Sequence, residues 1–333
     1  MVSLGACLVT GANGYIGRGL CTVLKRKGCH VRALLRKPAH HLIHEAAVFD
    51  ENHHDEVVYE DLKHLTRKMD LPALQPFMHV MQNIDTVFHL AGIAHATQSH
   101  SIRKEQYWQI NVEATEQLLY LAHQAGVKRF IYFSSVKAEG CPTDDYGSSK
   151  KAAEDSVLFL GKKYGIHVVI LRPALVYGPV CGSKIYGTKM KGNLAMMMRG
   201  IQQGWFPVLP EIKNQRSLVS IEDLIDAAIC AAQKPEINGK IYTITDGKCY
   251  SSRQLYDEMR KALGKAPAKF AVPFCLFQIL ANTGDILQFI LRRDLPFNSD
   301  ALEKLFGEAY YPCQDFENDL GWKPKHDFSQ INS

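Results

Sequence analysis

Short apolar runs alternate with amphipathic stretches along the first half of the chain. The runs predict buried strands at residues 8–10, 31–35, 57–62, 85–92 and 128–135. Apolar positions at helical spacing predict helices between them, at about residues 16–27 and 107–124. Strands that alternate with helices in this way predict an α/β fold with a doubly wound parallel sheet. Ligands bind such a sheet at the carboxyl ends of its strands, where Gly11, Ala91 and Ser135 fall.

Three glycines lie between the first predicted strand and the first predicted helix. Gly11 lets the chain turn tightly, Gly14 lets backbone N–H groups approach a diphosphate, and Gly17 lets the helix pack closely on the sheet. The helix N-terminus adds positive partial charge for the phosphates. The pattern predicts a Rossmann-type dinucleotide site that includes Asn13, Tyr15 and Ile16. Its alternative is a glycine-rich turn without a ligand.

The end of the second predicted strand indicates which dinucleotide binds. NAD-binding folds usually place an acid there for the ribose hydroxyls, whereas this chain has Leu35 followed by Arg36. A guanidinium pairs with a 2′-phosphate, so the pattern favours NADP(H). NAD(H) is the alternative if Arg36 is only a solvated charge. At the third strand, Asp61 could accept a hydrogen bond from the adenine amino group, with Leu62 against the ring.

Composition narrows the class of protein. The 333 residues are 46% hydrophobic, enough for one elaborate domain or two closely packed ones. The net charge of +5 comes without a Lys/Arg run, so nucleic acid is not indicated as a partner. We expect a cytoplasmic protein, because the nine cysteines form no Cys-x-x-Cys pair and no signal peptide is recognisable. The histidines between residues 38 and 79 match no compact ligand set, so no metal is expected.

A late segment, from Phe270 to Arg293, is rich in Phe, Leu and Ile. The polar residues from Asn282 to Asp285 are expected to divide it into two short helices, each too short to span a bilayer. These helices would cover the C-terminal core. Peripheral contact with a membrane is the minor alternative.

Tyr146 and Lys150 stand one turn apart at the start of a predicted helix, so the phenol and the ammonium share a helix face. A phenol has a pKa of about 10, and acid–base work near neutrality requires lowering it by about three units. Lys150 and the positive nicotinamide ring of an oxidised cofactor could both stabilise the phenolate. Ser135, at the end of the fifth predicted strand, could hydrogen-bond the substrate oxygen whose proton Tyr146 handles.

These residues resemble the extended short-chain dehydrogenases/reductases, which include nucleotide-sugar epimerases, dehydratases and reductases. The resemblance covers most of the chain and rests on residues 10–17, 61–62, 88–92, 111, 134–135, 146–150, 171–179 and 319–324. It implies catalysis by Ser135, Tyr146 and Lys150. It places Leu90, Ala91, Gly92, Pro173 and Val176 near the cofactor. It also implies an NAD(P)-binding domain of residues 1–172 and a substrate-binding part of residues 173–333, some segments of which return to the first domain.

Two matched segments concern the substrate. Asn193 matches a family residue that contacts a nucleotide diphosphate, and Arg216 matches one that meets the same phosphates. Residues 134–137 and 214–219 are most similar to bacterial 4-keto-sugar reductases, which implies a UDP-4-keto-hexosamine as the small-molecule partner. A UDP-sugar 4-epimerase is the close alternative, followed by a sterol- or flavonoid-type dehydrogenase and a non-catalytic dinucleotide-sensing scaffold. The resemblance is compatible with a homodimer.

Two features depart from the family pattern. The 4,6-dehydratases carry an acidic pair directly after the catalytic hydroxyl residue, whereas this chain has Val136 and Lys137, so a dehydratase is disfavoured. Only ten residues separate Ser135 from Tyr146, fewer than is usual in the family. The shortened loop leaves the approach of Tyr146 to Ser135 open.

Overall fold

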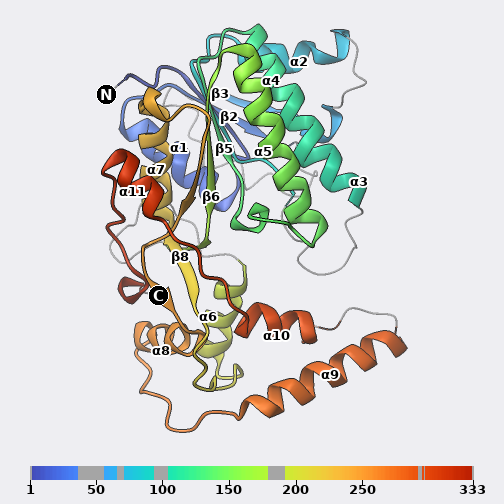
Figure 1. Cartoon of the computed structure of the whole chain (residues 1–333), viewed down its shortest axis with the longest axis vertical. Helices are drawn as coiled ribbons and strands as arrows, with labels where there is room; N and C mark the ends of the chain where they lie inside the picture. Colours follow the sequence, from blue (N-terminus) through green and yellow to red (C-terminus); the bar gives the residue numbers. More distant parts are fainter. Residues whose placement is uncertain are drawn as a thin grey trace.

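A seven-stranded parallel sheet, in the order β3-β2-β1-β4-β5-β6-β9, forms the larger part of the molecule (Figure 1). The computed structural model describes residues 2–36, 56–65, 71–93, 104–178, 192–291, 295 and 297–331. The strands are β1 (Cys7–Thr10), β2 (Val31–Leu35), β3 (Glu56–Tyr59), β4 (Thr86–His89), β5 (Arg129–Phe133), β6 (His167–Pro173) and β9 (Lys240–Ile244). Every neighbouring pair is parallel. The predicted α/β fold with a doubly wound parallel sheet is therefore confirmed.

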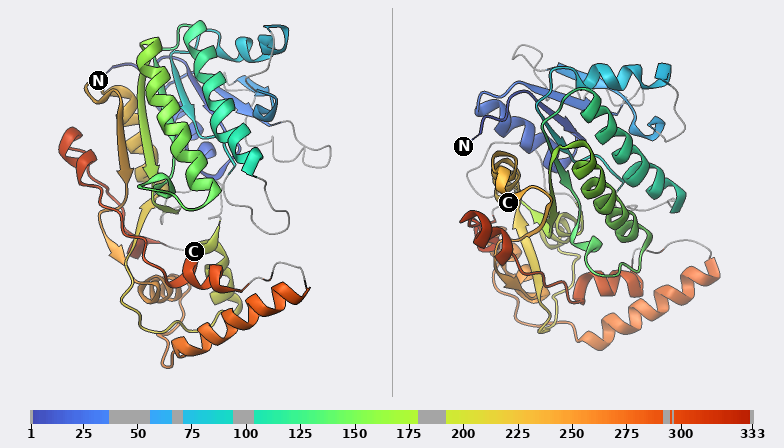
Figure 2. Two further views of the ribbon diagram at one scale, coloured as in Figure 1. Left: turned by 45° about the vertical axis from the view of Figure 1, so that its right-hand side comes forward. Right: turned by 45° about the horizontal axis from the view of Figure 1, so that its top comes forward.

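Helices cover both faces of this sheet (Figures 1 and 2). On one side lie α1 (Tyr15–Arg26) and α7 (Ile221–Gln233), and on the other lie α2 (Leu71–Met81), α4 (Ala114–Gln124) and α5 (Asp145–Tyr164). Successive strand residues point to opposite faces. Val9 and Ile131 therefore join the core under α1 and α7, whereas Leu8 and Phe130 join the core under α4 and α5. Strands buried on both faces explain the continuous apolar runs.

A smaller lobe lies beyond the carboxyl ends of these strands (Figure 1). Its three-stranded sheet, in the order β10-β8-β7, consists of β7 (Leu175–Tyr177), β8 (Arg216–Ser220) and β10 (Cys249–Tyr250). Its helices are α6 (Asn193–Gln203), α8 (Ser252–Ala262), α9 (Phe274–Leu291) and α10 (Ser299–Phe306). Tyr177, Leu218, Tyr256 and Phe328 form the centre of its own apolar core. Between these elements the chain returns to the larger sheet with α7, β9 and α11 (Gln314–Leu320).

Several predicted boundaries shift. The third strand ends at Tyr59, and a short 3-10 turn (Leu62–His64) follows instead of further strand. The helix expected over residues 107–124 begins earlier, as α3 (Lys104–Tyr107), and continues through a π-helical segment (Trp108–Glu113) into α4. Other 3-10 turns lie at Val136–Ala138, Pro235–Ile237 and Phe328–Gln330.

The prediction of two short helices in the late apolar segment is wrong, because α9 is one continuous helix from Phe274 to Leu291. The polar residues that were expected to end it find partners instead. The Thr283 hydroxyl donates to the Ile279 carbonyl over 2.7 Å, and Asp285 accepts from the Ser299 N–H over 3.1 Å. Gly284 is buried where a Cβ would lie 2.1 Å from the Phe297 carbonyl oxygen. Gly284 and Asp285 therefore fix the helix to the segment that follows it.

Candidate active site

The turn between β1 and α1 is shaped by its glycines. Gly11 has a φ of 67°, and a Cβ there would lie 2.9 Å from the Ala91 nitrogen. A Cβ on Gly17 would lie 2.3 Å from the Gly11 carbonyl oxygen, so α1 approaches the turn only without a side chain. The helix starts after Gly14 with no side-chain cap and no acid in its first turn. Its free N–H groups therefore fit the diphosphate of a dinucleotide.

Two residues of the predicted dinucleotide site also serve the fold. The Tyr15 hydroxyl donates to the Gly178 carbonyl over 2.5 Å, which joins α1 to the end of β7 in the smaller lobe. The Asn13 carbonyl accepts a hydrogen bond from Arg18 Nε over 3.0 Å, and Ile16 packs against the core. The Tyr15 hydroxyl is thus committed to a contact between the lobes.

The residues predicted at the adenosine end lie at the ends of β2 and β3. Arg36 is exposed directly after β2. Asp61 accepts from the Lys63 N–H over 3.0 Å and lies 3.2 Å from Lys63 Nζ, so its carboxylate caps the 3-10 turn. Leu62 is only 7% exposed and belongs to the core under α2 and α4. The contacts of these residues with adenosine stay predictions.

A buried histidine behind the glycine turn was not singled out from the sequence. His89 Nδ1 lies 2.7 Å from Thr10 Oγ1, and His89 Nε2 lies 2.9 Å from Thr115 Oγ1. The Thr115 hydroxyl donates to the Asn111 carbonyl, so it must accept from Nε2, and Nδ1 must accept from Thr10. Thr10 Oγ1 in turn accepts from the Ala91 N–H over 3.1 Å. A neutral His89 therefore fixes the ends of β1 and β4 together.

Acid is expected to weaken the fold through His89. Burial and the nearby Lys150 charge lower the pKa of His89 to about 3. The unfolded chain binds a proton at this ring below a pH of about 6.5, which the folded chain excludes. As the pH falls from about 6.5 to about 3, the free energy of unfolding should therefore decrease. This residue contributes up to about 1.4 kcal/mol of that decrease per pH unit. Urea unfolding at several pH values should show a shallower slope in His89→Gln, and the wild-type slope in His30→Gln, which alters an exposed ring.

Asn111, in the π-helical segment, connects the end of β4 to α5. Its amide bonds both backbone groups of Ile93, over 2.8 and 3.1 Å, and donates to Ser149 Oγ over 3.0 Å. The Ser149 hydroxyl donates to the Tyr146 carbonyl over 2.8 Å. A Cβ on Gly92 would lie 2.9 Å from Asn111 Oδ1, so glycine is required for this approach. Asn111 therefore positions the first turn of the helix that carries Tyr146.

The structure brings Ser135 and Tyr146 together despite the short loop between them. Ser135 follows β5, and Asp144 caps α5 by accepting from the Gly147 N–H over 2.7 Å. The side chain of Ser135 hydrogen-bonds the Tyr146 hydroxyl, which lowers the pKa of Tyr146, but burial outweighs it and raises that pKa above its ordinary value. Without a cofactor the phenol is therefore protonated at neutral pH. The predicted lowering of its pKa has to come from positive charge on a bound cofactor.

Lys150 lies one turn further along α5 and is buried. Its Nζ donates to the Phe133 carbonyl over 2.7 Å and stands 4.3 Å from the centre of the Tyr132 ring. Burial lowers the pKa of Lys150 to about 7, and the charge of Glu154 opposes that shift. The charge of Lys150 therefore changes with small shifts of pH near neutrality.

Together these residues can move a proton at the edge of the sheet. In such a transfer Ser135 would hydrogen-bond a substrate oxygen and Tyr146 would give or take its proton, with Lys150 one turn along the same helix. A bound nicotinamide dinucleotide would supply or accept the hydride. Within the described ranges no three His, Cys, Asp or Glu side chains are grouped to hold a metal ion. Of the histidines in the His-rich stretch, 40, 41, 44, 53 and 54 lie outside the described residues.

The residues predicted to bind the substrate diphosphate lie in the smaller lobe. Asn193 is the exposed first residue of α6. Arg216 begins β8, and its Nη1 donates to the Gly307 carbonyl over 2.8 Å. Burial lowers the pKa of Arg216. Pro173 ends β6 and Val176 lies in β7, on the path between the two lobes.

The fold and these residues define a dinucleotide-dependent enzyme of the dehydrogenase type. The model of the NAD dependent epimerase/dehydratase family matches residues 7–245. This chain belongs to that family, and it is an NAD(P)-dependent enzyme of the extended short-chain dehydrogenase/reductase type. The names of its relatives describe enzymes that act on different substrates. UDP-glucose 4-epimerase from Vibrio cholerae is 28% identical over 95% of this chain and 90% of its own length. A 3-beta-hydroxysteroid dehydrogenase from Mycolicibacterium neoaurum is 25% identical over 96% and 86%.

Solved structures show the same fold. The UDP-glucuronic acid 4-epimerase from Bacillus cereus, in complex with UDP-glucuronic acid and NAD, superposes with a TM-score of 0.71. It is 21% identical, with 97% of this chain and 95% of the other covered. UDP-glucose 4-epimerase from Thermotoga maritima has a TM-score of 0.69 at 19% identity, covering 98% and 95%. The likeness extends over both lobes.

Proposed function

We propose that this chain is a UDP-sugar 4-epimerase. The observation that carries the proposal is the hydrogen-bonded pair of Ser135 and Tyr146, with Lys150 one turn along the same helix. The name of the Vibrio cholerae relative supports the same reaction. A bound nicotinamide dinucleotide would accept the hydride of C4 and return it to the opposite face of the sugar. Tyr146 takes the proton of the C4 hydroxyl in the first half-reaction and returns it in the second. Arg216 and Asn193 hold the diphosphate while the sugar rotates to present its other face.

The reaction can be followed directly by proton NMR. The purified chain is incubated with UDP-glucose or UDP-N-acetylglucosamine and a trace of NAD⁺. Epimerisation should produce the galacto isomer with no net formation of NADH, because the hydride returns to the sugar. The proposal fails if neither sugar is converted and calorimetry detects no binding of UDP in the presence of cofactor. Binding of a sterol instead would favour a lipid-type dehydrogenase.

A UDP-4-keto-hexosamine reductase is the second candidate, and Arg36 favours it. An exposed arginine at the end of β2 suits the 2′-phosphate of NADPH. A reductase consumes its cofactor and must exchange it in each turnover, whereas an epimerase regenerates it. Stoichiometric oxidation of NADPH by a 4-keto-sugar nucleotide, without epimerisation of UDP-glucose, would identify the reductase.

Replacing Arg36 by Ala should weaken NADPH binding by about 1.5–3 kcal/mol, the range for hydrogen bonds to a charged group. NADH binding should stay nearly unchanged, because NADH lacks the 2′-phosphate. Fluorescence titration of both cofactors measures the difference. Arg26→Ala, which removes an exposed arginine at the far end of α1, serves as the control. Equal losses for the two cofactors, or tighter NADH binding by the wild type, would refute the NADP(H) preference.

Replacing Arg216 by Ala should raise the KM for a UDP-sugar by about tenfold or more, because a phosphate oxygen loses a charged donor in a half-buried site. Cofactor affinity should scarcely change, since the cofactor phosphates lie at the glycine turn. Arg216 also bonds the Gly307 carbonyl, so the thermal midpoint of the variant is measured in parallel. Arg216→Lys keeps a charge and should recover part of the loss. An unchanged KM in a folded Ala variant would exclude Arg216 from the site.

A further inference from the structure

The feature that the proposed function leaves unused is α9, which lies at the end of the molecule far from the seven-stranded sheet (Figures 1 and 2). Its 18 residues have a mean hydropathy of 1.5, and only 17% of them are buried. By length and composition alone it could cross a membrane. Within the described part of the chain it is the only helix with that property.

The exposed aliphatic residues of α9 share one side of the helix, at spacings of three, four and seven residues. They are Leu276, Ile279, Leu280, Ile286, Leu287, Ile290 and Leu291, each between 42% and 65% exposed, and we call them the α9 face. Thr283 lies among them, but its hydroxyl is satisfied within the helix. The polar residues Gln278, Asn282 and Asp285 lie on the adjoining side, together with Phe289, which is 87% exposed. The exposed part of α9 therefore has a continuous aliphatic sector beside a mainly polar one.

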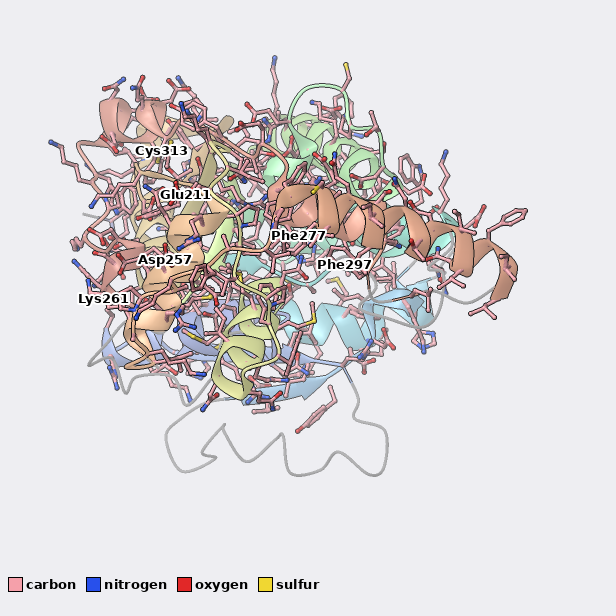
Figure 3. All side chains as sticks on the ribbon, turned by 90° about the horizontal axis from the view of Figure 1, so that it is seen from below. Glu211, Asp257, Lys261, Phe277, Phe297 and Cys313 are labelled. Atoms are coloured by element: carbon pink, nitrogen blue, oxygen red, sulfur yellow. The ribbon has the colours of Figure 1, made fainter. Side chains whose placement is uncertain are left out.

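The opposite side of α9 is fixed to the protein. Phe277, Ala281 and Gly284 are buried, and the Phe277 ring packs 5.2 Å from that of Phe306 and 6.3 Å from that of Phe297. Figure 3, seen from below, shows Phe277 and Phe297 beside the helix. The side chain of Gln288 accepts from Asn298 Nδ2 over 3.1 Å. A spanning helix would have to break these contacts, so α9 can meet a membrane only while lying flat against it.

The chemistry of the face indicates the kind of partner. It offers aliphatic side chains on a projecting, convex rod and no free hydrogen-bonding group, whereas protein interfaces carry about one hydrogen bond per 100–200 Å². A fluid hydrocarbon surface needs neither directional groups nor a matching shape. Just before the helix, Lys269 and Phe270 are both exposed, Phe270 by 86%. In the sequence, Arg292, Arg293 and Asp294 follow the helix directly and lie outside the described residues. The exposed Lys269 and the net positive charge of this stretch of sequence complement anionic lipid headgroups.

We propose that the α9 face docks in the plane of an anionic lipid bilayer, and so holds the smaller lobe at the membrane surface while the large sheet stays in water. This inference does not depend on the proposed reaction. The α9 face takes no part in the catalytic or diphosphate-binding residues named above. Activity on a soluble UDP-sugar should therefore be the same with and without docking.

Vesicle flotation of the full chain tests the proposal. The wild type should float with vesicles of phosphatidylethanolamine and phosphatidylglycerol, less with pure phosphatidylcholine, and less at high salt. Ile286→Asp/Ile290→Asp should weaken partitioning by about tenfold or more, since two aliphatic groups can no longer enter hydrocarbon. Phe159→Ser, which removes an exposed apolar residue of α5, is the matched control and should float like the wild type. Ile279→Ser/Ile290→Ser repeats the test without added charge.

Other outcomes would overturn docking. Failure of the wild type to float with either vesicle, or equal flotation of the α9 variants, excludes it. Retention of the protein on vesicles in alkaline carbonate would indicate a span instead of a surface contact. A dimer in ultracentrifugation that only the α9 variants dissociate, without flotation of the wild type, would assign the face to a second copy of the chain.

Discussion

Turnover of Tyr146→Phe is expected to fall by about 10²–10⁴-fold, the usual contribution of one acid–base group. The substitution keeps the ring, which packs 6.1 Å from that of Tyr107, and removes only the hydroxyl that Ser135 hydrogen-bonds. Cofactor affinity should stay nearly intact, because the glycine turn is untouched. Steady-state rates and cofactor titrations on the same preparation separate the two effects.

The matched control is Tyr164→Phe, at the far end of the same helix, where the ring stacks on His123. It should turn over like the wild type. A Tyr146→Phe rate within a few-fold of the wild type would contradict the assignment of Tyr146 as the acid–base group. Loss of cofactor binding in that variant would mean that the hydroxyl serves the dinucleotide site instead.

Strands β1, β2, β4 and β5 could be predicted from sequence because nearly all their residues are buried and they read as apolar runs. β6 and β9 of the same sheet were not among the predicted strands. The second strand, Val31–Leu35, was predicted with its observed bounds. α9 could not be predicted correctly, since the residues that normally end a helix are satisfied here by distant partners. Asp285 meets Ser299, and Gly284 approaches the Phe297 carbonyl. The local sequence pattern does not predict contacts with residues this far along the chain.

In the candidate site, too, some residues could be predicted from the sequence and others could not. Tyr146 and Lys150 were found because their spacing puts them on one helix face, and Ser135 because it follows a predicted strand at the edge where ligands bind. The structure brings Ser135 to Tyr146. The supporting network was missed, because His89 meets Thr10 across 79 positions of the sequence. Its only local signal is a histidine inside an apolar strand. The contacts of Arg36, Asn193 and Arg216 with their ligands stay predictions.

A buried ion pair supports the catalytic helix from behind. Glu154, one turn after Lys150 on α5, is fully buried and accepts from Arg172 Nε over 2.8 Å and from its Nη2 over 2.6 Å. Arg172 lies in β6, and its side chain is only 13% exposed. The pair therefore joins α5 to the sheet and places a negative charge near Lys150.

Replacing Glu154 by Gln is expected to cost about 3–5 kcal/mol of folding free energy, since Arg172 keeps a buried charge without its partner. The pKa of Lys150 should fall below its value of about 7, because Glu154 is the group that raises it. At neutral pH less Lys150 is then charged, so the optimum of activity should move to lower pH. Urea unfolding measures the first effect, and a pH–rate profile measures the second.

Two variants distinguish this account from a loss of packing. Asp155→Asn removes the neighbouring acid, whose pair with Lys151 is exposed, and should cost no more than about 1 kcal/mol with no shift of the pH profile. Glu154→Gln/Arg172→Met removes both charges and should regain much of the stability lost in Glu154→Gln, because no unpaired charge is left buried. The shifted pH profile should persist in this double variant, since Glu154 still no longer faces Lys150. A profile restored to that of the wild type would show that Arg172, not Glu154, controls the charge of Lys150.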